Sequence, residues 1–396
     1  MKSHILVVSQ YFYPESFRIN DICHELVSRG HKVTVLTGIP NYPEGRFFKG
    51  YGWFKKRKEK WNGINIIRIP IISRGKSSIQ LILNYYSFVF FGYLRSLFFK
   101  IKPDFVFSCE VSPMTQVLVG RRLSKKKKIP HFVYIQDLWP DNLEIVGGVK
   151  NVKILDHYAK MSKKIYEQSD IVFATSPSFV ETIRERMDSD KEKVKYLPQY
   201  AETVECFDRP TDDLKESDTF DVVFAGNIGM AQGLEVLPRA AALLKNDNVR
   251  FVIVGDGRAK SKLMQEINAD GVEDMFVWLG HKHSDDVPSY LARCDAAFVS
   301  FSANALFEKT IPAKLQTYMT CSMPIIAAAG GETRRIIEEA DCGLCCESGD
   351  AAALAETIRK AKTLDLKRLG ENAKAYCDGN FSKEKIIGYL DSLFEK

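Results

Sequence analysis

Short apolar segments alternate with segments of helical periodicity along almost the whole chain, and this alternation restricts the fold more than any other feature. Segments such as His4–Ser9 and Lys32–Thr37 are nearly continuous in hydrophobic residues, as in strands buried on both faces of a sheet. Helical periodicity follows them, for example over Phe17–Arg29, which ends at Gly30, a residue suited to a left-handed C-cap. The order predicts an α/β protein with doubly wound parallel sheets covered by helices on both faces.

The expected elements form two series. In the first, the strands are 4–9, 32–37, 64–69, 104–108, 131–135 and 171–174, and the helices are 17–29, 113–123 and 151–168. In the second, the strands are 220–225, 250–254, 275–279, 296–301, 324–328 and 343–346, and the helices are 232–244, 259–268, 287–292, 313–320, 333–339 and the tail from 351. The polar stretch between Tyr196 and Phe220 contains Pro198 and Pro210 and is typical of a linker. A chain of 396 residues is also too long for one ordinary core.

Charge divides the chain at the same place. Residues 1–199 carry 33 Lys and Arg against 18 Asp and Glu, a balance of +15, and residues 200–396 carry 23 against 32, a balance of −9. Halves of opposite charge indicate domains with different partners. The basic runs 55–58 and 125–128 have no zinc-finger or RNA-recognition motif beside them, so we expect no nucleic-acid partner.

Cysteine usage and the N-terminus indicate a reducing compartment. The nine cysteines are odd in number and scattered, which favours free thiols over a disulfide framework. Cys342 and Cys345 form a CxxC without a second ligand pair, so a zinc site is not expected. The chain runs directly into a strand pattern, without the charged and apolar regions of a secretory signal.

The strongly apolar segment Ile79–Phe99 permits three interpretations. Polar residues such as Asn84 and Arg95 interrupt it, which leaves a short apolar stretch for a bilayer span. It can be a buried helix, or an aromatic-rich helix that lies in a membrane interface, flanked by Lys100 and Lys102. A transmembrane helix is the third interpretation.

Two glycine-containing turns follow expected strands in the second half. The first contains Gly226, Asn227, Gly229 and Gln232, and the second contains Gly255, Asp256 and Gly257. A glycine-rich strand-to-helix turn presents backbone N–H groups and a positive helix end to an anion, which suits a nucleotide phosphate. A plain tight turn stays open for each. Because neither a complete GxGxxG nor a GxxxxGK[ST] is present, a nicotinamide cofactor and a P-loop are not expected.

The segment 307–319 combines charge with a helix start. Pro312 suits the first turn of a helix. Glu308 precedes that helix and Gln316 lies one turn inside it, so both can face a ligand at the helix N-terminus, while Lys309 and Lys314 add positive charge. The alternative is a surface loop followed by an ordinary amphipathic helix.

Candidates for a second ligand follow the strands of the first half. They are Tyr13, Glu15 and Arg18 after the first strand, Asn41 and Tyr42 after the second, and Asp137 after the strand at 131–135. A carboxylate at the carboxyl end of a parallel strand is well placed to contact a substrate hydroxyl. Helix capping is the alternative role of the charged residues in this set.

Together these segments resemble those of the family 4 glycosyltransferases of the GT-B fold, in the O-antigen and capsule subgroup. The resemblance covers nearly the whole chain and rests on SQYFYPESFRINDICHELVSRGHKVTVLTGIPNYPEG, IQDLWPD, GNIGMAQG, VGDG and EKTIPAKLQTYM. Within the subgroup, the N-acetyl-L-fucosamine transferases of O-antigen assembly are the most similar. The resemblance implies two Rossmann-like domains that face a deep cleft, 1–199 for the acceptor and 200–378 for the donor, and a C-terminal helix at 379–396 that crosses back to the first domain.

The resemblance also implies roles for individual residues. It implies a UDP-sugar donor in the second domain and transfer with retention. Glu308 and Gln316 fall on the family's E-x7-E motif, where Glu308 would hold sugar hydroxyls and Gln316 the ribose hydroxyls. The family's G-R-x4-K-G phosphate clamp reads Gly226-Asn227 to Gln232-Gly233 here, so both cations are missing. Lys314 is the first candidate to replace them, with Lys309, Arg18 or backbone N–H groups as alternatives.

The implied acceptor is a polyprenyl-diphosphate-linked saccharide on the cytoplasmic face of the plasma membrane. The basic first half, with the aromatic segment Ile79–Lys102, would then bind the anionic leaflet as a peripheral protein. Asp137 would assist as a base. No cofactor is expected, because the UDP-sugar is a substrate, and no metal, because the only DxD, Asp188-Ser189-Asp190, lies in a charged helix-to-loop stretch. A UDP-sugar 2-epimerase of the same fold and a non-catalytic membrane adaptor remain open alternatives.

Overall fold

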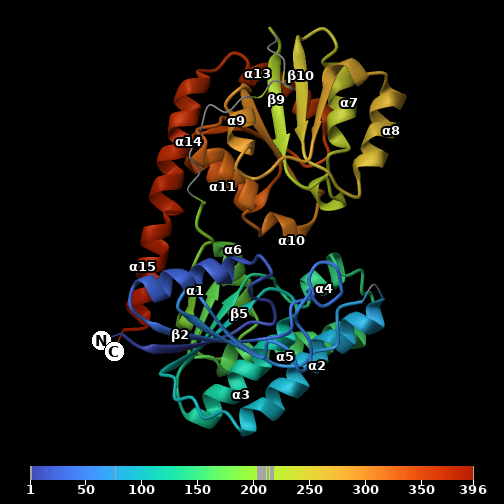
Figure 1. The fold of residues 1–396 in the computed structure, drawn as a ribbon. Coiled ribbons are helices and arrows are strands. Elements are labelled where there is room, and N and C mark those ends of the chain that lie inside the picture. The colour runs from blue at the N-terminus through green and yellow to red at the C-terminus, as the bar shows by residue number, and fades with distance from the viewer. Residues whose placement is uncertain (1, 76, 203–210, 212–213, 215–217, 396) are drawn as a thin grey trace. The chain divides into compact units, whose positions relative to one another are not determined.

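The computed structural model describes residues 2–75, 77–202, 211, 214 and 218–395. They form two compact units (Figure 1). Unit 1 contains the chain up to Pro198 and again from Glu384, and unit 2 contains Gln199–Lys383. The predicted boundary after residue 199 lies beside this division, whereas most of the predicted linker after residue 202 lies outside the described residues.

Unit 1 is built on an eight-stranded sheet with β1 near its centre, in the order β3-β4-β2-β1-β5-β6-β7-β8. Only the β3–β4 pair is antiparallel among the strand pairs of this sheet. The strands are β1 His4–Val8, β2 Lys32–Thr37, β3 Lys58–Trp61, β4 Ile64–Arg68, β5 Phe105–Glu110, β6 His131–Ile135, β7 Ile171–Ala174 and β8 Val194–Tyr196. The helices are α1 Arg18–Ser28, α2 Ser78–Leu97, α3 Val117–Lys127, α4 Asp141–Ile145, α5 Val152–Gln168, α6 Pro177–Glu185 and α15 Lys383–Leu393, with 3₁₀ turns at Met114–Gln116 and Lys191–Lys193.

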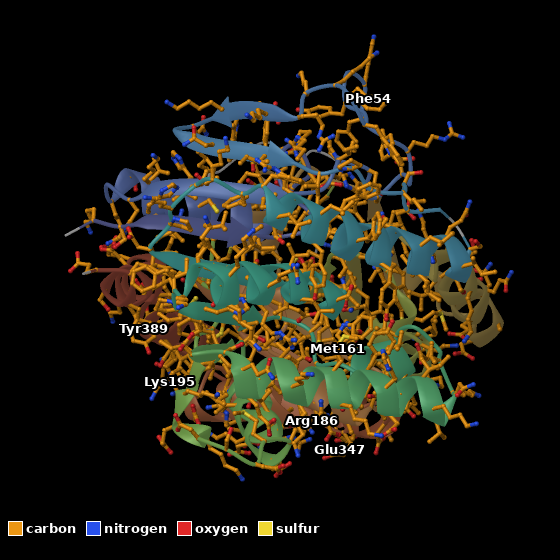
Figure 2. The ribbon with its side chains drawn as sticks, turned by 90° about the horizontal axis from the view of Figure 1, so that it is seen from below. Phe54, Met161, Arg186, Lys195, Glu347 and Tyr389 are labelled. Atoms are coloured by element: carbon orange, nitrogen blue, oxygen red, sulfur yellow. The ribbon has the colours of Figure 1, made fainter. Side chains whose placement is uncertain are left out.

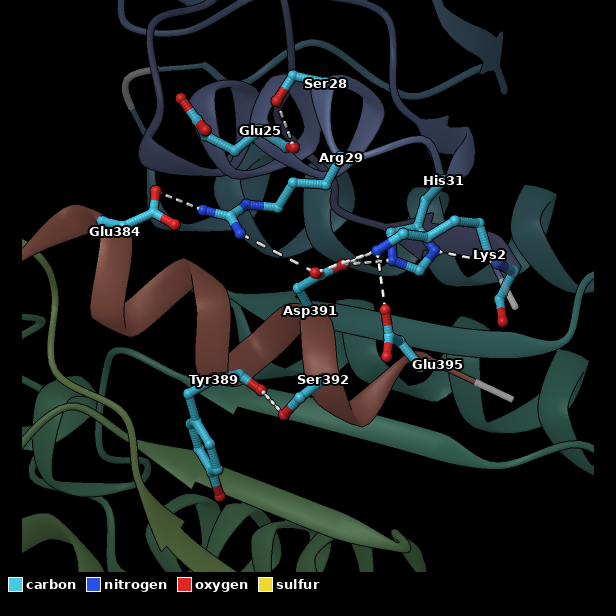
Figure 3. A network of polar contacts seen from close by, with 11 residues as sticks. Lys2, Glu25, Ser28, Arg29, His31, Glu384, Tyr389, Asp391, Ser392 and Glu395 are labelled. Carbon is cyan, nitrogen blue, oxygen red and sulfur yellow. Dashed lines mark hydrogen bonds and ion pairs between the residues drawn. The ribbon is translucent and has the colours of Figure 1, made fainter.

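Helix α15 completes unit 1 from the far end of the sequence. Its Asp391 carboxylate lies 3.0 Å from Lys2 Nζ and 2.6 Å from His31 Nε2 (Figure 3). Just after the helix, Phe394 is fully buried, and its ring centroid lies 5.5 Å from that of Phe105 and 5.4 Å from that of Phe132. The two ends of the chain therefore lie side by side in this unit (Figure 1).

Unit 2 is built on a six-stranded, fully parallel sheet in the order β11-β10-β9-β12-β13-β14. The strands are β9 Phe220–Ala225, β10 Val249–Val254, β11 Phe276–Gly280, β12 Ala296–Ser300, β13 Ile325–Ala328 and β14 Gly343–Cys346. The helices are α7 Val236–Leu243, α8 Lys260–Asp270, α9 Val287–Leu291, α10 Ala305–Glu308, α11 Ala313–Thr320, α12 Gly331–Glu339, α13 Ala351–Ala361 and α14 Leu366–Asn380, with 3₁₀ turns at Met230–Gln232 and Glu273–Met275. In each sheet the strand order reverses beside the first strand, between β1 and β5 in unit 1 and between β9 and β12 in unit 2. Parallel sheets bind their ligands at the carboxyl edge beside such a reversal.

The predicted α/β class and parallel sheets are confirmed, and several boundaries differ. The expected helix at 113–123 begins as a 3₁₀ turn and continues as α3 to Lys127. The expected helix at 232–244 begins only at Val236, because Gly233 adopts a left-handed conformation with φ of 61°. Strand β3 lies at the end of the basic run 55–58, and its antiparallel pairing with β4 was not predicted.

Helix α2 has an unusual distribution of polarity. Its buried face contains small and polar residues, including Asn84, Ser87, Gly92 and Ser96, beside two aromatic residues. Its exposed face is apolar and consists of Ile79, Ile82, Leu83, Tyr86, Phe90, Leu94 and Leu97. Within the described part of the chain, no helix combines the length and hydropathy that crossing a bilayer requires.

Candidate functional sites at the two sheet edges

The two glycine turns of unit 2 pack directly on each other at the carboxyl edge of the sheet. The Gly226 N–H donates to the Val254 carbonyl at 2.8 Å, and the Ile228 N–H donates to the Asp256 carbonyl at 2.9 Å. A Cβ on Gly255 would lie 1.9 Å from the Gly226 carbonyl oxygen, so only glycine permits this approach. These two amides are therefore engaged within unit 2 and do not point to an anion.

Helix α11 brings a lysine to these turns. The hydroxyl of Tyr318 accepts a hydrogen bond from the Ala225 N–H at 2.7 Å and donates one to the Ala225 carbonyl at 3.0 Å. This fixes α11 against the end of β9. Lys314 precedes Tyr318 by one helical turn, so its side chain lies on the same face of the helix, above Gly226.

Among the described residues, the ammonium group of Lys314 contacts neutral groups. Its ammonium group donates a hydrogen bond to Gln232 Oε1 and lies 4.0 Å from the centroid of the Phe224 ring. Within the described residues it forms no ion pair with a carboxylate. Burial lowers the pKa of Lys314 to about 7. The predicted residues Gly226, Gln232 and Lys314 are thus brought together.

Glu308 lies at the same sheet edge, against the turn that follows β13. A Cβ on Gly331, whose φ is +56°, would lie 1.9 Å from the Glu308 carbonyl oxygen, and a Cβ on Gly330 would lie 3.6 Å from Glu308 Oε1. Glu308 is exposed and stands beside the first residue of α12, where helix amides favour negative charge. Glu308 and Lys314 therefore both lie in the connection that follows β12, with Glu308 against the turn after β13 and Lys314 above the turn after β9.

The remaining predicted donor residues differ in their surroundings. Gln316 is 3% exposed, and its side-chain amide already donates a hydrogen bond to the Gln199 carbonyl at 2.7 Å. Its predicted role in binding the ribose hydroxyls remains a prediction. Asn227 is exposed. Asp256 is exposed and accepts a hydrogen bond from the Gly257 N–H at 2.7 Å.

Glu15 is the organising residue of the predicted acceptor side. It is 3% exposed and does not belong to α1, although the sequence places it near that helix start. Its Oε1 accepts from the N–H groups of Asn41 and Tyr42, both at 2.7 Å, and its Oε2 accepts from Phe12 N–H at 3.3 Å. Despite these donors, burial raises the pKa of Glu15 to about 7. Glu15 thus links the connections after β1 and β2, and its contact with an acceptor remains a prediction.

Aromatic rings line the same connections. Tyr11 stacks on Phe17 with ring centroids 5.2 Å apart, and Tyr42 packs against both. Tyr13 stacks separately on Trp61 at 4.4 Å. Arg18 is the first residue of α1, as predicted.

Asp137, which follows β6, links its connection by hydrogen bonds to the connection after β5. Its Oδ2 accepts from the Ser112 N–H at 2.8 Å and from Ser112 Oγ at 2.7 Å. It does not cap α4, whose N-cap is Pro140, so the capping alternative is wrong. Beside it lies Glu110, a buried carboxyl that the sequence did not single out; its pKa is well above the usual range because of burial and then the charge of Asp137.

The described residues contain no group of three His, Cys, Asp or Glu side chains arranged to hold a metal ion. The eight described cysteines are free thiols. Metal independence itself remains a prediction.

Comparison with known protein families shows which class of protein these two units belong to. Residues 17–200 match the family model described as Glycosyltransferase Family 4, and residues 209–376 match the model described as Glycosyl transferases group 1. The chain belongs to the family 4 glycosyltransferases. The two models match the two structural units in turn.

Individual relatives agree with this assignment. The chain is 27% identical to the putative colanic acid biosynthesis glycosyl transferase WcaI of Escherichia coli K12, over 97% of each chain. It is 27% identical to the probable glycosyltransferase WbjE of Pseudomonas aeruginosa, over 63% of this chain and 64% of that protein.

Solved structures confirm the predicted GT-B fold. Sucrose-phosphate synthase of Thermosynechococcus elongatus superposes with a TM-score of 0.76 and 16% identity, over 99% of this chain and 98% of that one. HepE of Anabaena, in complex with UDP and glucose, superposes with a TM-score of 0.68 and 15% identity, over 98% of each chain.

The buried Glu15 predicts a pH-dependent stability of unit 1. Its folded pKa of about 7 exceeds the ordinary value of 4.5, so the folded state binds the proton more tightly. The free energy of unfolding should therefore fall as pH rises from about 5 to 7, by roughly 2–3 kcal/mol relative to Glu15→Gln, which cannot titrate. Denaturant titrations followed by tryptophan fluorescence measure this, because Trp53, Trp61 and Trp139 lie in unit 1. A difference between the two proteins that is constant with pH would contradict it.

Proposed function

We propose that this glycosyltransferase moves a sugar from a UDP-sugar to a polyprenyl-diphosphate-linked saccharide in the assembly of a bacterial surface polysaccharide. The observation that carries the proposal is the ammonium group of Lys314, held without a carboxylate partner among the described residues, at the Gly226 turn beside Gln232. A buried cation with neutral neighbours is stabilised by an anionic ligand, and the diphosphate of a nucleotide-sugar supplies that charge.

The relatives support the same substrate classes. HepE carries UDP and glucose in its structure, WcaI is named for colanic acid biosynthesis, and both resemble this chain over nearly its full length. N-acetyl-L-fucosamine, or another N-acetylhexosamine, is the sugar that we propose, on the resemblance of the sequence motifs. In unit 2 the donor would lie at the carboxyl edge of β9 and β12, where the chain order reverses.

We assign the roles as follows. Lys314 neutralises the leaving diphosphate, and the exposed carboxylate of Glu308 holds hydroxyls of the donor sugar. Asp137 contacts the acceptor hydroxyl as an assisting base and relays its proton toward the leaving phosphate. The bond between the sugar C1 and the acceptor oxygen forms as the bond from C1 to the UDP oxygen breaks, and the acceptor proton goes to the leaving phosphate. Catalysis then rests on positioning and charge stabilisation, without a metal or a covalent enzyme intermediate.

The acceptor class fits the outward surface of α2. That face is apolar over five turns, and Trp53 packs edge-on against Phe91 of the same helix at 5.4 Å. Phe54, the next residue in the chain after Trp53, is 93% exposed and lies at the periphery of unit 1 (Figure 2). Lys55 and Lys56 follow it in sequence.

Basic residues also adjoin the C-terminal end of α2. Lys126 of α3 donates to the carbonyls of Ser96 and Leu97, both at 2.8 Å, which caps the C-terminus of α2. The lysine run 125–128 thus lies next to the last exposed apolar residues of α2. Exposed apolar side chains with lysines beside them suit the surface of an anionic membrane, where a lipid-linked acceptor resides. We place the protein at the cytoplasmic face of the plasma membrane.

Transfer is tested with a panel of UDP-sugars, including UDP-N-acetyl-L-fucosamine, and a short polyprenyl-diphosphate-linked N-acetylglucosamine, with a chelator present. We expect the lipid mass to rise by one sugar. Glu308→Gln should lower the rate by about 100-fold or more, because a charge-assisted contact to the sugar is lost. Glu338→Gln, an exposed glutamate on α12, is the matched control and should stay within about twofold.

Other outcomes of the same assay select other functions. A UDP-sugar that isomerises while no lipid gains mass would favour the 2-epimerase. If no UDP-sugar reacts and none binds, the chain is a non-catalytic adaptor. Transfer that stops with the chelator would contradict metal independence.

Lys314 should make donor binding depend on pH. With a pKa of about 7, Lys314 is charged below pH 7 and neutral above it. The Kd for UDP-N-acetylglucosamine should rise roughly tenfold between pH 6.5 and 8.5, because binding must then also protonate Lys314. Lys314→Met should bind weakly at every pH, whereas Lys309→Met should keep the pH dependence. Calorimetry measures both, and an unchanged affinity of Lys314→Met would remove Lys314 from the donor site.

Membrane binding is tested by cosedimentation with vesicles. We expect binding to phosphatidylglycerol vesicles that weakens with salt, and Phe90→Glu should weaken it about tenfold, because a large apolar side chain no longer inserts. Leu243→Glu changes an apolar residue of unit 2 that is 51% exposed, against 59% for Phe90, and should bind like the wild type. Equal binding to pure phosphatidylcholine would contradict the electrostatic part of the proposal.

A further inference from the structure

The geometry points to Arg74 as the residue that binds the diphosphate of the lipid-linked acceptor, with the aromatic rings of Tyr11 and Tyr42 beside it. This inference rests on the proposed function for the class of acceptor. It concerns unit 1 alone and a residue that none of the sequence motifs contains.

Three connections from the carboxyl edge of the sheet hold Arg74 in place. Glu15, after β1, accepts hydrogen bonds from the backbone of Asn41 and Tyr42, after β2. The side chain of Asn41 in turn accepts from the Arg74 N–H at 2.7 Å, after β4. A Cβ on Gly45 would lie 2.0 Å from the Arg74 carbonyl oxygen, so the connection after β2 also packs closely on Arg74. The backbone of Arg74 is therefore fixed before any ligand binds.

The guanidinium of Arg74 has aromatic neighbours instead of an acid. It lies 5.2 Å from the centroid of the Tyr42 ring, and one of its N–H groups donates to the Tyr11 hydroxyl at 3.4 Å. Among the described residues, no carboxylate forms an ion pair with it. Other buried or half-buried arginines of unit 1 do pair with acids: Arg29 with Glu384, Arg68 with Glu59, and Arg186 with Asp141.

A guanidinium that has no acidic partner can bind a phosphate group. The guanidinium has five N–H donors in a planar fork, which matches two oxygens of a phosphate group. One of these donors contacts a phenol, and an aromatic ring covers one face of the cation, so donors remain for a ligand. The phenol and the ring offset part of the water that this half-buried cation has lost, and a bound anion would offset the rest.

The position of Arg74 in the chain adds the reason for a lipid-linked diphosphate. Helix α2 begins four residues later, and its exposed apolar face starts with Ile79 and Ile82. The segment before Arg74 is fixed to the same helix, because the Ile72 carbonyl accepts from Asn84 Nδ2 at 2.6 Å and the Ile72 N–H donates to Ser87 Oγ at 2.9 Å. A cation for the diphosphate and an apolar helix face for the isoprenoid chain thus adjoin each other in one unit.

The test measures binding to the full-length protein without requiring transfer. Farnesyl diphosphate, a soluble isoprenoid diphosphate, is titrated by calorimetry with UDP in excess to occupy the donor site. Arg74→Gln should weaken binding at least tenfold, and Arg74→Lys should recover part of the loss, because lysine keeps the charge without the planar fork. The affinity for UDP should not change, so this loss is separable from a failure of the donor site.

The matched control is Arg122→Gln, which removes the same charge from unit 1. Arg122 also lies over a tyrosine ring, 4.8 Å from the centroid of Tyr93, but on the side of α3 that packs against α2. It should bind farnesyl diphosphate within about twofold of the wild type. An equal loss in Arg122→Gln would show that net charge alone is responsible, and wild-type affinity in Arg74→Gln, or no binding by the wild type, would overturn the inference.

Inorganic pyrophosphate is the second probe. It should bind more weakly than farnesyl diphosphate, because it lacks the chain that would contact α2. Equal affinity for the two probes would overturn the part of the inference that assigns α2 to the isoprenoid.

Discussion

Parallel pairing is the constraint on which the rest of the molecule depends. Because neighbouring strands run in the same direction, their carboxyl ends meet at one edge of each sheet, and every candidate residue lies in a connection that leaves that edge. In unit 2, this edge brings the turn after β9 to the loop and helix that follow β12, although some 80 residues of sequence separate Gly226 from Glu308. In unit 1, it brings together the connections after β1, β2 and β4. The hydrogen bonds of Tyr318 and Glu15 then fix the details.

Each edge holds a cation that the protein itself leaves without an acidic partner among the described residues. Lys314 is enclosed by a glycine turn, an amide and a ring, and Arg74 by two phenols. Elsewhere, arginines such as Arg250 and Arg359 pair with aspartates. An unpaired cation in a sheltered position lowers the stability of the empty protein, and it is stabilised when an anion binds. Donor and acceptor of the proposed reaction both carry a diphosphate, so two such cations match the two substrates.

The sequence predicts the general arrangement well and the individual contacts poorly, for physical reasons. Hydrophobic alternation predicts most strands because burial on both faces leaves a continuous apolar run, as in β1 and β12. Lys314 could be predicted because it follows a helix-starting proline, but its bond to Gln232 depends on how α11 docks. Glu15 is a charged residue near a helix start, and only the structure shows that its carboxylate lies under the connection after β2. Arg74 follows β4 and Glu110 ends β5, just as Asn41 follows β2. A position at the carboxyl end of a strand was therefore the only sequence feature that could have indicated a role for Arg74 or Glu110. No pattern of residue types separated them from ordinary surface or core residues.

The path of the chain has a consequence for synthesis of the protein. Unit 1 begins at the N-terminus, but its aromatic core includes Phe394, which is made only after all of unit 2. On the ribosome, unit 2 can complete its sheet while the first unit still lacks its closing helix and exposes Phe105 and Phe132. The first domain to be translated is therefore the last to be finished. Loss of only the final dozen residues would leave every strand of both sheets in the chain and yet remove the ion pairs and aromatic contacts that close the acceptor-side unit.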